Sequence, residues 1–179
     1  MTTKYELIDD PSGLKRLRAL RDIPRFGVKA GDLGGLVGAA GNLDQLGDAW
    51  VSGNAQVYGN AWVSGNARVS GNALVSGDAL VSGDARVSGY AQIEKPIHTW
   101  AISGPITGEA SHATLARLKD NGHMVQVGCW AGDIPSLRAL ANSDDWPSGE
   151  GKEYRDLWRP SLLAVADLFE SRVAMWSES

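Results

Sequence analysis

An aliphatic residue recurs every six positions through the middle of the chain, and this period limits what the chain can fold into. The positions are Val51, Val57, Val63, Val69, Val75, Val81, Val87 and Ile93. An alanine stands two residues before each of them, and a Gly-Asn or Gly-Asp pair precedes most of the alanines, as in VSGDALVSGDARVSG. Glycine at this frequency excludes an α-helix, because each one costs about 1 kcal/mol relative to alanine.

The repeat has a direct structural interpretation as short strands separated by corners. Alanine and valine two positions apart point to one side of a strand, and the residue between them points to the other side. Glycine, Asn and Asp accept the left-handed backbone that a corner needs. Three units make one coil of 18 residues with alanine and valine inside, which predicts a parallel β-helix. Before Val51 the phase continues imperfectly, with Leu43 at an alanine position and Gln45 at a valine position, so we expect the solenoid to begin near Leu33 and to fray into its cap.

The motif resembles that of the left-handed hexapeptide-repeat family, which runs aliphatic, small, any, any, small, any. The left hand is implied by this resemblance alone, because parallel crossovers are normally right-handed. Right-handed helices of the bactofilin type, with approximate hexads, remain the alternative. With ALRDIPRFGVKAGDLGGLV before the repeats and LKDNGHMVQVGCWAGDIPSLRAL after them, nearly the whole chain is similar to small phage and prophage hexapeptide-repeat proteins. These are often labelled transferases on the strength of the repeat.

The expected fold is mainly β, with three segments. Residues 1–32 form an N-terminal cap that starts with a strand and a turn, residues 33–95 form a short left-handed parallel β-helix of about three coils, and residues 96–179 form a C-terminal α+β unit. That unit is expected to contain a hairpin followed by two or three helices.

The hairpin of the C-terminal unit is predicted from Asn121-Gly122, a strong type I′ turn signal. A two-residue turn there places Leu118 opposite Val125, and it places Cys129 on the apolar face, as a core residue. Asp133 is the expected N-cap of the next helix. Pro160 either starts the last helix or kinks a longer one.

The outward residues of the solenoid form three columns, because each face returns every 18 residues. The columns are Trp50, Arg68 and Arg86; Gln56, Leu74 and Gln92; and Trp62 and Leu80. Soluble monomers avoid large apolar patches, so we expect another subunit or the C-terminal segment to cover them. A homo-oligomer, with a trimer favoured, is predicted to use an interface formed by Trp62, Leu74, Leu80 and Tyr58.

Catalysis is not favoured by the distribution of histidines. Hexapeptide acyltransferases, which this repeat resembles, use a histidine at the coils as general base toward an acyl-CoA acceptor. Here His98, His112 and His123 all follow the repeats. A γ-type carbonic anhydrase would need three coil histidines on its metal. We therefore predict no catalytic residue, no metal site and no cofactor.

The arginine column suggests binding of a small anion. Stacked guanidinium groups and an indole could clasp a phosphate and a flat ring. The candidate ligand-binding residues are Trp50, Arg68, Arg86, Arg117, His123 and Trp130. A second basic cluster, between Lys15 and Lys29, is interpreted as a solvated face rather than an anion site.

Composition narrows the possible partners and the compartment. The net charge of −4 argues against duplex nucleic acid, and no apolar run approaches the roughly 20 residues of a membrane helix. A single cysteine fits a cytoplasmic protein, in the host cytoplasm if the gene is viral. The favoured function is a non-catalytic oligomeric binding module that sequesters a small anionic or nucleotide-like ligand at subunit interfaces. The alternatives are a structural or assembly protein and a hexapeptide acyltransferase using acyl-CoA.

Overall fold

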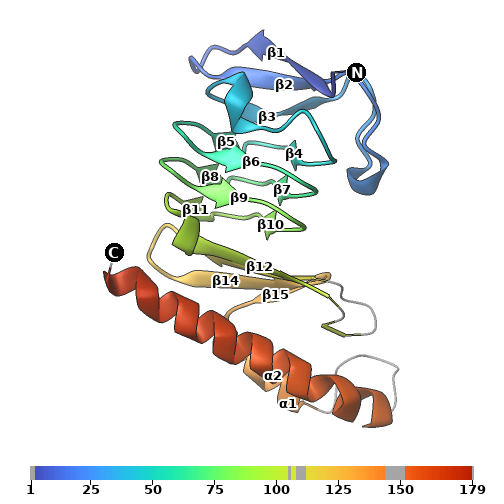
Figure 1. Ribbon diagram of the computed structural model, residues 1–179, viewed down its shortest axis with the longest axis vertical. Helices are drawn as coiled ribbons and strands as arrows, with labels where there is room; N and C mark the ends of the chain where they lie inside the picture. Colours follow the sequence, from blue (N-terminus) through green and yellow to red (C-terminus); the bar gives the residue numbers. More distant parts are fainter. Residues whose placement is uncertain (1–2, 105, 108–111, 144–151, 179) are drawn as a thin grey trace.

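The computed structural model describes residues 3–104, 106–107, 112–143 and 152–178. The chain builds a column of layers: an antiparallel hairpin, a parallel β-solenoid, an antiparallel sheet, and two helices at the far end (Figure 1). This confirms the prediction of a mainly β fold with a short solenoid and a C-terminal unit of sheet and helices.

The elements follow one another in the order of the layers. The N-terminal part contains β1 (Tyr5–Asp9), β2 (Lys15–Ala19), η1 (Pro24–Phe26), β3 (Leu33–Val37) and η2 (Ala40–Asn42). The repeats form β4 (Trp50–Val51), β5 (Gln56–Val57), β6 (Trp62–Val63), β7 (Arg68–Val69), β8 (Leu74–Val75), β9 (Leu80–Val81), β10 (Arg86–Val87) and β11 (Gln92–Ile93). The C-terminal part contains η3 (Pro96–His98), β12 (Thr99–Ser103), β13 (His112–Arg117), β14 (His123–Val127), β15 (Trp130–Gly132), α1 (Ile134–Asn142), α2 (Lys152–Ala174) and η4 (Met175–Glu178).

The two-residue strands stack in parallel on three faces. We call β4-β7-β10 the arginine face, β5-β8-β11 the glutamine face and β6-β9 the tryptophan face. The alanines and aliphatic residues of the repeat fill the interior, and none of them is more than 2% exposed. The corner glycines have φ angles between 60° and 69°, where a side chain would be strained. The repeat therefore plays the role that its pattern predicts.

Polar side chains close the upper end of the solenoid. Within it, Ala67 accepts a hydrogen bond from the backbone N–H of Trp50 in the coil above. Ala49, one coil higher, accepts its bond from the buried Lys4 side chain instead, with Nζ to O at 2.9 Å. On the tryptophan face, Asn42 Nδ2 donates to the carbonyl of Ala61 at 2.8 Å. These side chains satisfy carbonyls that would otherwise face a missing coil.

The antiparallel sheet β12-β13-β14-β15 closes the lower end. The backbone N–H of Arg86 donates to Thr114 Oγ1 at 3.0 Å, where an inner coil would supply a carbonyl. The other side of the sheet packs on the two helices through a second hydrophobic core that includes Leu115, Val125, Leu137 and Phe169. Strand β13 is thus buried on both sides, between the solenoid and the helices.

The predicted register of the C-terminal hairpin is wrong by three residues. Leu115, not Leu118, lies opposite Val125, and the connecting loop is longer than two residues. Asn121 has φ 64°, but Gly122 does not share a positive φ, so the type I′ turn is not formed. Leu118 instead forms an isolated bridge with Ala91 of the solenoid. This tertiary contact outweighs the local turn preference.

Three further details of the C-terminal unit bear on the sequence predictions. Cys129 is exposed, so its assignment to the core is wrong; the turn at Gly128, with φ 58°, interrupts the alternation on which that assignment rested. Asp133 caps α1 as predicted, accepting a hydrogen bond from the backbone N–H of Ser136 at 2.8 Å. Pro160 lies inside α2 and does not start it.

Candidate functional site

The arginine face carries the predicted column of large side chains. Arg86 pairs with Arg68, and Arg68 pairs with Trp50, in register on adjacent parallel strands. Neighbouring strands of a sheet lie about 4.8 Å apart, so the two arginines leave the backbone close together. Both side chains are half-buried.

A loop from the N-terminal part brings a third arginine to this face. The segment between β2 and β3 runs down beside β4 and β7 (Figure 1). The guanidinium carbon of Arg68 lies 5.5 Å from the centre of the Phe26 ring. Arg25 reaches further and pairs with Asp84 at 2.6 Å. Residues far apart in the sequence thus meet on one face.

The charges in this cluster do not balance. Among the residues that the structure describes, Arg25, Arg68 and Arg86 face one carboxylate, Asp84, which leaves two positive charges in excess. Asp84 is itself held by Arg25 and by Asn66 Nδ2 at 3.3 Å. Among the described residues, the buried Nε of Arg68 has no hydrogen-bond partner. The cluster therefore holds a donor and positive charge that the described part of the chain does not neutralise.

Burial, together with the same imbalance, lowers two pKa values. Burial lowers the pKa of Arg86, and the nearby Arg25 and Arg68 lower it further, against the attraction of Asp84. His112, at the start of β13, is buried. Burial also lowers its pKa, with a further contribution from Arg86. The neutral form of this histidine is therefore favoured beneath the arginines.

Trp50 does not serve as the predicted ligand platform. Its side chain is only 1% exposed and lies in the main hydrophobic core with Leu17. A Cβ on Gly34 would come within 2.8 Å of the indole, so only glycine fits there. The N-terminal strands have enclosed the top of the column, and no ligand ring can stack on Trp50.

Three other candidates from the sequence lie apart from this cluster. Arg117 and His123 face each other across the hairpin, but each already has a partner. Arg117 pairs with Glu94 at 3.3 Å, and His123 Nε2 accepts a hydrogen bond from the backbone N–H of Ile134 at 3.0 Å. Trp130 is half-buried against the helical core. The structure does not bring these three together with Arg68 and Arg86.

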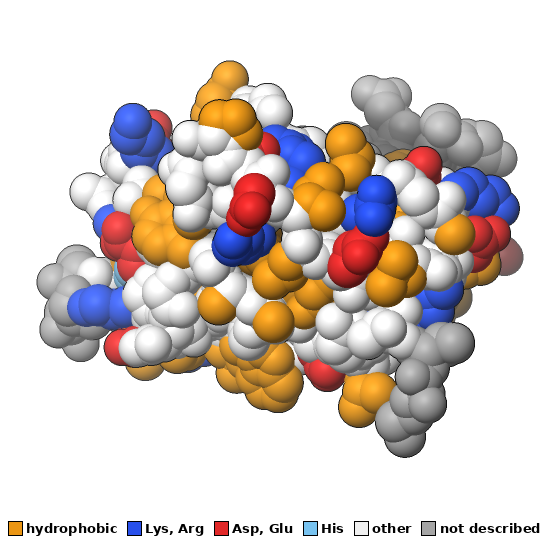
Figure 2. Space-filling view, turned by 90° about the horizontal axis from the view of Figure 1, so that it is seen from above, with side chains coloured by type: hydrophobic (Ala, Val, Ile, Leu, Met, Phe, Trp, Pro, Cys, Tyr) orange, Lys and Arg blue, Asp and Glu red, His pale blue; other side chains and the backbone are white. Residues whose placement is uncertain are grey.

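The site also contains a residue that the sequence pattern did not single out. Arg25 belongs by sequence to the basic cluster of the N-terminal part, whose other members form ion pairs within that part, except Arg21, which reaches Asp48 at the first corner of the repeats. The pairs are Lys15–Asp9, Arg16–Asp10, Arg18–Glu6, Arg21–Asp48 and Lys29–Asp22. Figure 2, which views the molecule from the end that carries the N-terminal strands, shows basic and acidic side chains next to each other. Arg25 differs from the other members of that cluster in pairing with Asp84 beside Arg86 on the arginine face, and no local pattern signals that contact.

The tryptophan face carries an exposed apolar stripe. Trp62 and Leu80 lie in register and are 47% and 41% exposed. Trp100 of β12 is 38% exposed and, with Leu80 and Arg172, lines a hollow of about 230 Å³. The other two predicted interface residues, Leu74 and Tyr58, are half-buried. Arg172 of α2 lies over the Trp100 ring, 5.2 Å from its centre, so α2 covers part of the stripe at its lower end.

Neither a metal centre nor a membrane helix is found in the ranges that the structure describes. Within them, no three His, Cys, Asp or Glu residues come together as a possible metal site. The helices there are too short or too polar to span a bilayer.

Comparison with known proteins bears on the fold. Residues 55–67 and 67–83 match the family described as YdcK beta solenoid repeat. The two stretches lie within the stacked coils and support the β-solenoid. A comparison of the chain with curated proteins finds no match.

Proposed function

We propose that this chain is a non-catalytic binding protein whose arginine face takes a small anion with phosphate-like or carboxylate oxygens. The observation that carries the proposal is the cluster of Arg25, Arg68 and Arg86 around Asp84, the one carboxylate that the described ranges place there. Guanidinium groups held this close repel one another, and an anion between them would remove that repulsion. Arginine also presents paired N–H donors that match such oxygens.

Burial supports the same ligand chemistry. The buried Nε of Arg68, without a partner among the described residues, leaves a donor desolvated, which costs about 1–3 kcal/mol. An anionic oxygen would satisfy it. The enclosed Trp50 removes the stacking partner for a nucleobase, so the proposed ligand is defined by its anionic group.

Titration calorimetry with inorganic phosphate, pyrophosphate and citrate, in a buffer without competing anions, tests this site. We expect at least one of them to bind saturably, and Arg86→Gln to weaken that binding by about tenfold or more, as for loss of a charged hydrogen bond. Arg18→Gln is the matched control, because Arg18 pairs with Glu6 on the hairpin. It should bind like the unmodified protein.

The same variants give a second readout that does not need the ligand. Because like charges and burial destabilise the Arg86 guanidinium, Arg86→Gln should raise the melting temperature in the absence of anions. It should also reduce the gain in melting temperature on adding pyrophosphate. The proposal is wrong if none of the three anions binds, or if Arg86→Gln binds as tightly as the Arg18→Gln control.

The exposed stripe favours self-association as a second candidate property. Trp62, Leu80 and Trp100 present large apolar side chains along one side of the column. A second copy of the chain has the same spacing between coils and could pack against this stripe. Such an oligomer would suit a structural or assembly role, and a trimer is the state that we expect.

A further inference from the structure

Tyr90 breaks the rule of the repeat at a position where the fold does not require it. The seven preceding units have Asn or Asp after the corner glycine: Asp48, Asn54, Asn60, Asn66, Asn72, Asp78 and Asp84. Gly89, before Tyr90, has φ 65°, like the other corner glycines. The backbone at Tyr90 therefore suits Asn equally well, and the reason for a tyrosine there lies in what its side chain presents to solvent.

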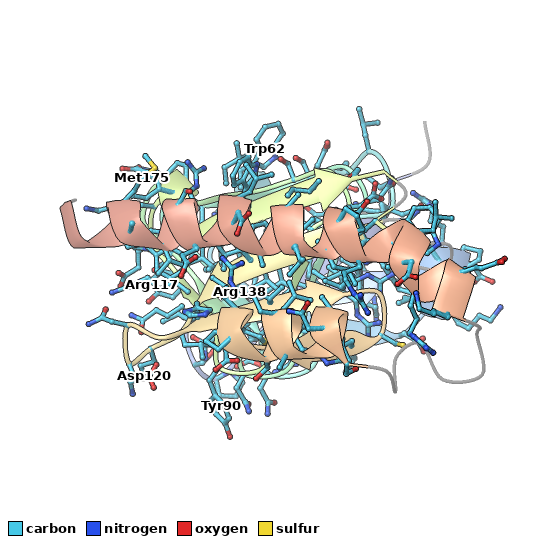
Figure 3. The ribbon with its side chains drawn as sticks, turned by 90° about the horizontal axis from the view of Figure 1, so that it is seen from below. Trp62, Tyr90, Arg117, Asp120, Arg138 and Met175 are labelled. Carbon is cyan, nitrogen blue, oxygen red and sulfur yellow. The ribbon has the colours of Figure 1, made fainter. Side chains whose placement is uncertain are left out.

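The corner side chains above Tyr90 are joined by hydrogen bonds from one coil to the next, and this series stops at Tyr90. Asn54 Nδ2 donates to Asn72 Oδ1 at 3.2 Å, and equivalent bonds join Asn60 to Asp78 and Asn66 to Asp84 on the other corners. Tyr90 lies one coil below Asn72 and is 71% exposed. Figure 3 shows it pointing away from the body of the molecule, on the side opposite Trp62. It belongs neither to the core nor to the apolar stripe.

Two hollows meet at Tyr90. One, of about 360 Å³, lies on the glutamine face and is lined by amide side chains, including Gln56, Asn72 and Gln92, and by Leu74 between the two glutamines. The other, of about 540 Å³, is formed with Leu118, Lys119 and Asp120 of the hairpin loop. Tyr90 and Lys119 line both. Each volume falls in the range of small-molecule sites.

The chemistry of this surface is that of a neutral ligand rich in hydroxyl groups. Amide side chains both donate and accept hydrogen bonds, as hydroxyl groups do. Gln92 Nε2 donates to Glu94 Oε1 at 2.8 Å, which fixes this amide in place. An exposed tyrosine ring offers a flat apolar face. Lys119 and Asp120 carry opposite charges in the hollow at the hairpin loop, and Lys119 is the charged residue lining the amide hollow. This surface therefore carries less positive charge than the arginine face.

We propose that Tyr90 and the amides of the glutamine face form a carbohydrate-binding site, in which the tyrosine ring stacks on a pyranose. Gln56, Asn72 and Gln92 would bond the hydroxyl groups, and the hairpin loop would contact the next sugar unit. This site lies on a different face from the proposed anion site and does not depend on it.

Saturation-transfer NMR and titration calorimetry with maltotriose, chitotriose and lactose test the proposal on the full chain. We expect saturable binding of at least one of these neutral oligosaccharides. Tyr90→Asn should weaken it by about tenfold, because it removes the stacking surface. This variant restores the residue that other units have, so the fold should be retained. Tyr90→Phe keeps the ring and should bind like the unmodified chain.

Two controls separate sugar binding at Tyr90 from binding elsewhere on the chain and from a protein partner. Arg86→Gln should leave oligosaccharide binding unchanged, whatever its effect on anions. The proposal is overturned if none of the three oligosaccharides binds, or if Tyr90→Asn binds as well as Tyr90→Phe. Capture of an apolar peptide with no response to sugars would also overturn it, since that result would assign the exposed ring to a protein partner.

Discussion

Trp50 on the arginine face and Trp62 on the tryptophan face occupy the same position of the six-residue unit, yet their surroundings are opposite. Trp50 is 1% exposed and Trp62 is 47% exposed. The backbone around them is the same, with an inward alanine before and an inward valine after each tryptophan. The difference comes from outside the solenoid, because the N-terminal part folds over one face and leaves the other open. A repeat therefore specifies its interior, and its neighbours decide what each outer face does.

The largest expected effect is on stability, and it separates the two tryptophans directly. Trp50→Ala should lower the free energy of unfolding by about 3–5 kcal/mol, the usual cost of emptying a buried aromatic site. Trp62→Ala should cost far less within one chain, because that side chain is half in solvent. Chemical denaturation of both variants measures this. Equal losses would show that the two faces are covered alike in solution.

Self-association gives the next largest contrast, and here the change on the tryptophan face is expected to have the larger effect. Trp62→Gln should reduce the oligomeric mass of the protein, because it puts a polar group into the apolar stripe. Arg68→Gln, the matched change on the arginine face, should leave the mass unchanged. Light scattering over a range of protein concentrations makes the comparison. A monomeric unmodified protein at all concentrations would contradict the predicted oligomer.

The smallest effect concerns pH and the caps above the two faces. Burial lowers the pKa of Lys4, which caps Ala49 on the arginine face, to about 8. Between pH 8 and 10 the unfolded chain then binds more protons than the folded one, so stability should rise with pH. Burial raises the pKa of Tyr5 to about 12, so above pH 10 its effect opposes this gain.

Matched variants isolate the contribution of Lys4. Lys4→Met should abolish the rise between pH 8 and 10, since the group that titrates is gone. Asn42→Ala, which removes the neutral cap of the tryptophan face, should lower stability but keep the same slope. Melting temperatures across this pH range provide the test. A slope that survives in Lys4→Met would assign the effect to another group.

Much of the fold follows from local pattern. The alternation of Ala and Val, the corner glycines, and the Asp133 cap each act over a few residues, and each is found as predicted. The predicted register of the C-terminal hairpin is wrong, because a long-range bridge from Leu118 to Ala91 outweighs the local turn signal at Asn121-Gly122. Strand β13 is buried on both sides, so its residues do not alternate between buried and exposed, the pattern that would show which side chains share a face.

The candidate site divides in the same way. The period of the sequence is enough to predict that Arg68 and Arg86 stack, since they occupy the same position of the six-residue unit and lie 18 residues, or one coil, apart. The enclosure of Trp50 and the arrival of Arg25 depend on where a loop from the N-terminal part comes to lie. Nothing within a six-residue unit encodes those contacts.

By itself, the sequence of this protein determined a solenoid with an alanine and valine interior, because a strict period acts through short-range geometry. The tertiary structure alone decided which outward side chains are buried, which charged groups lie close together, and which aromatic rings face solvent. The physical reason is that burial and electrostatic balance are sums over every neighbour in space. Segments far away in the chain contribute as much to them as the repeat does.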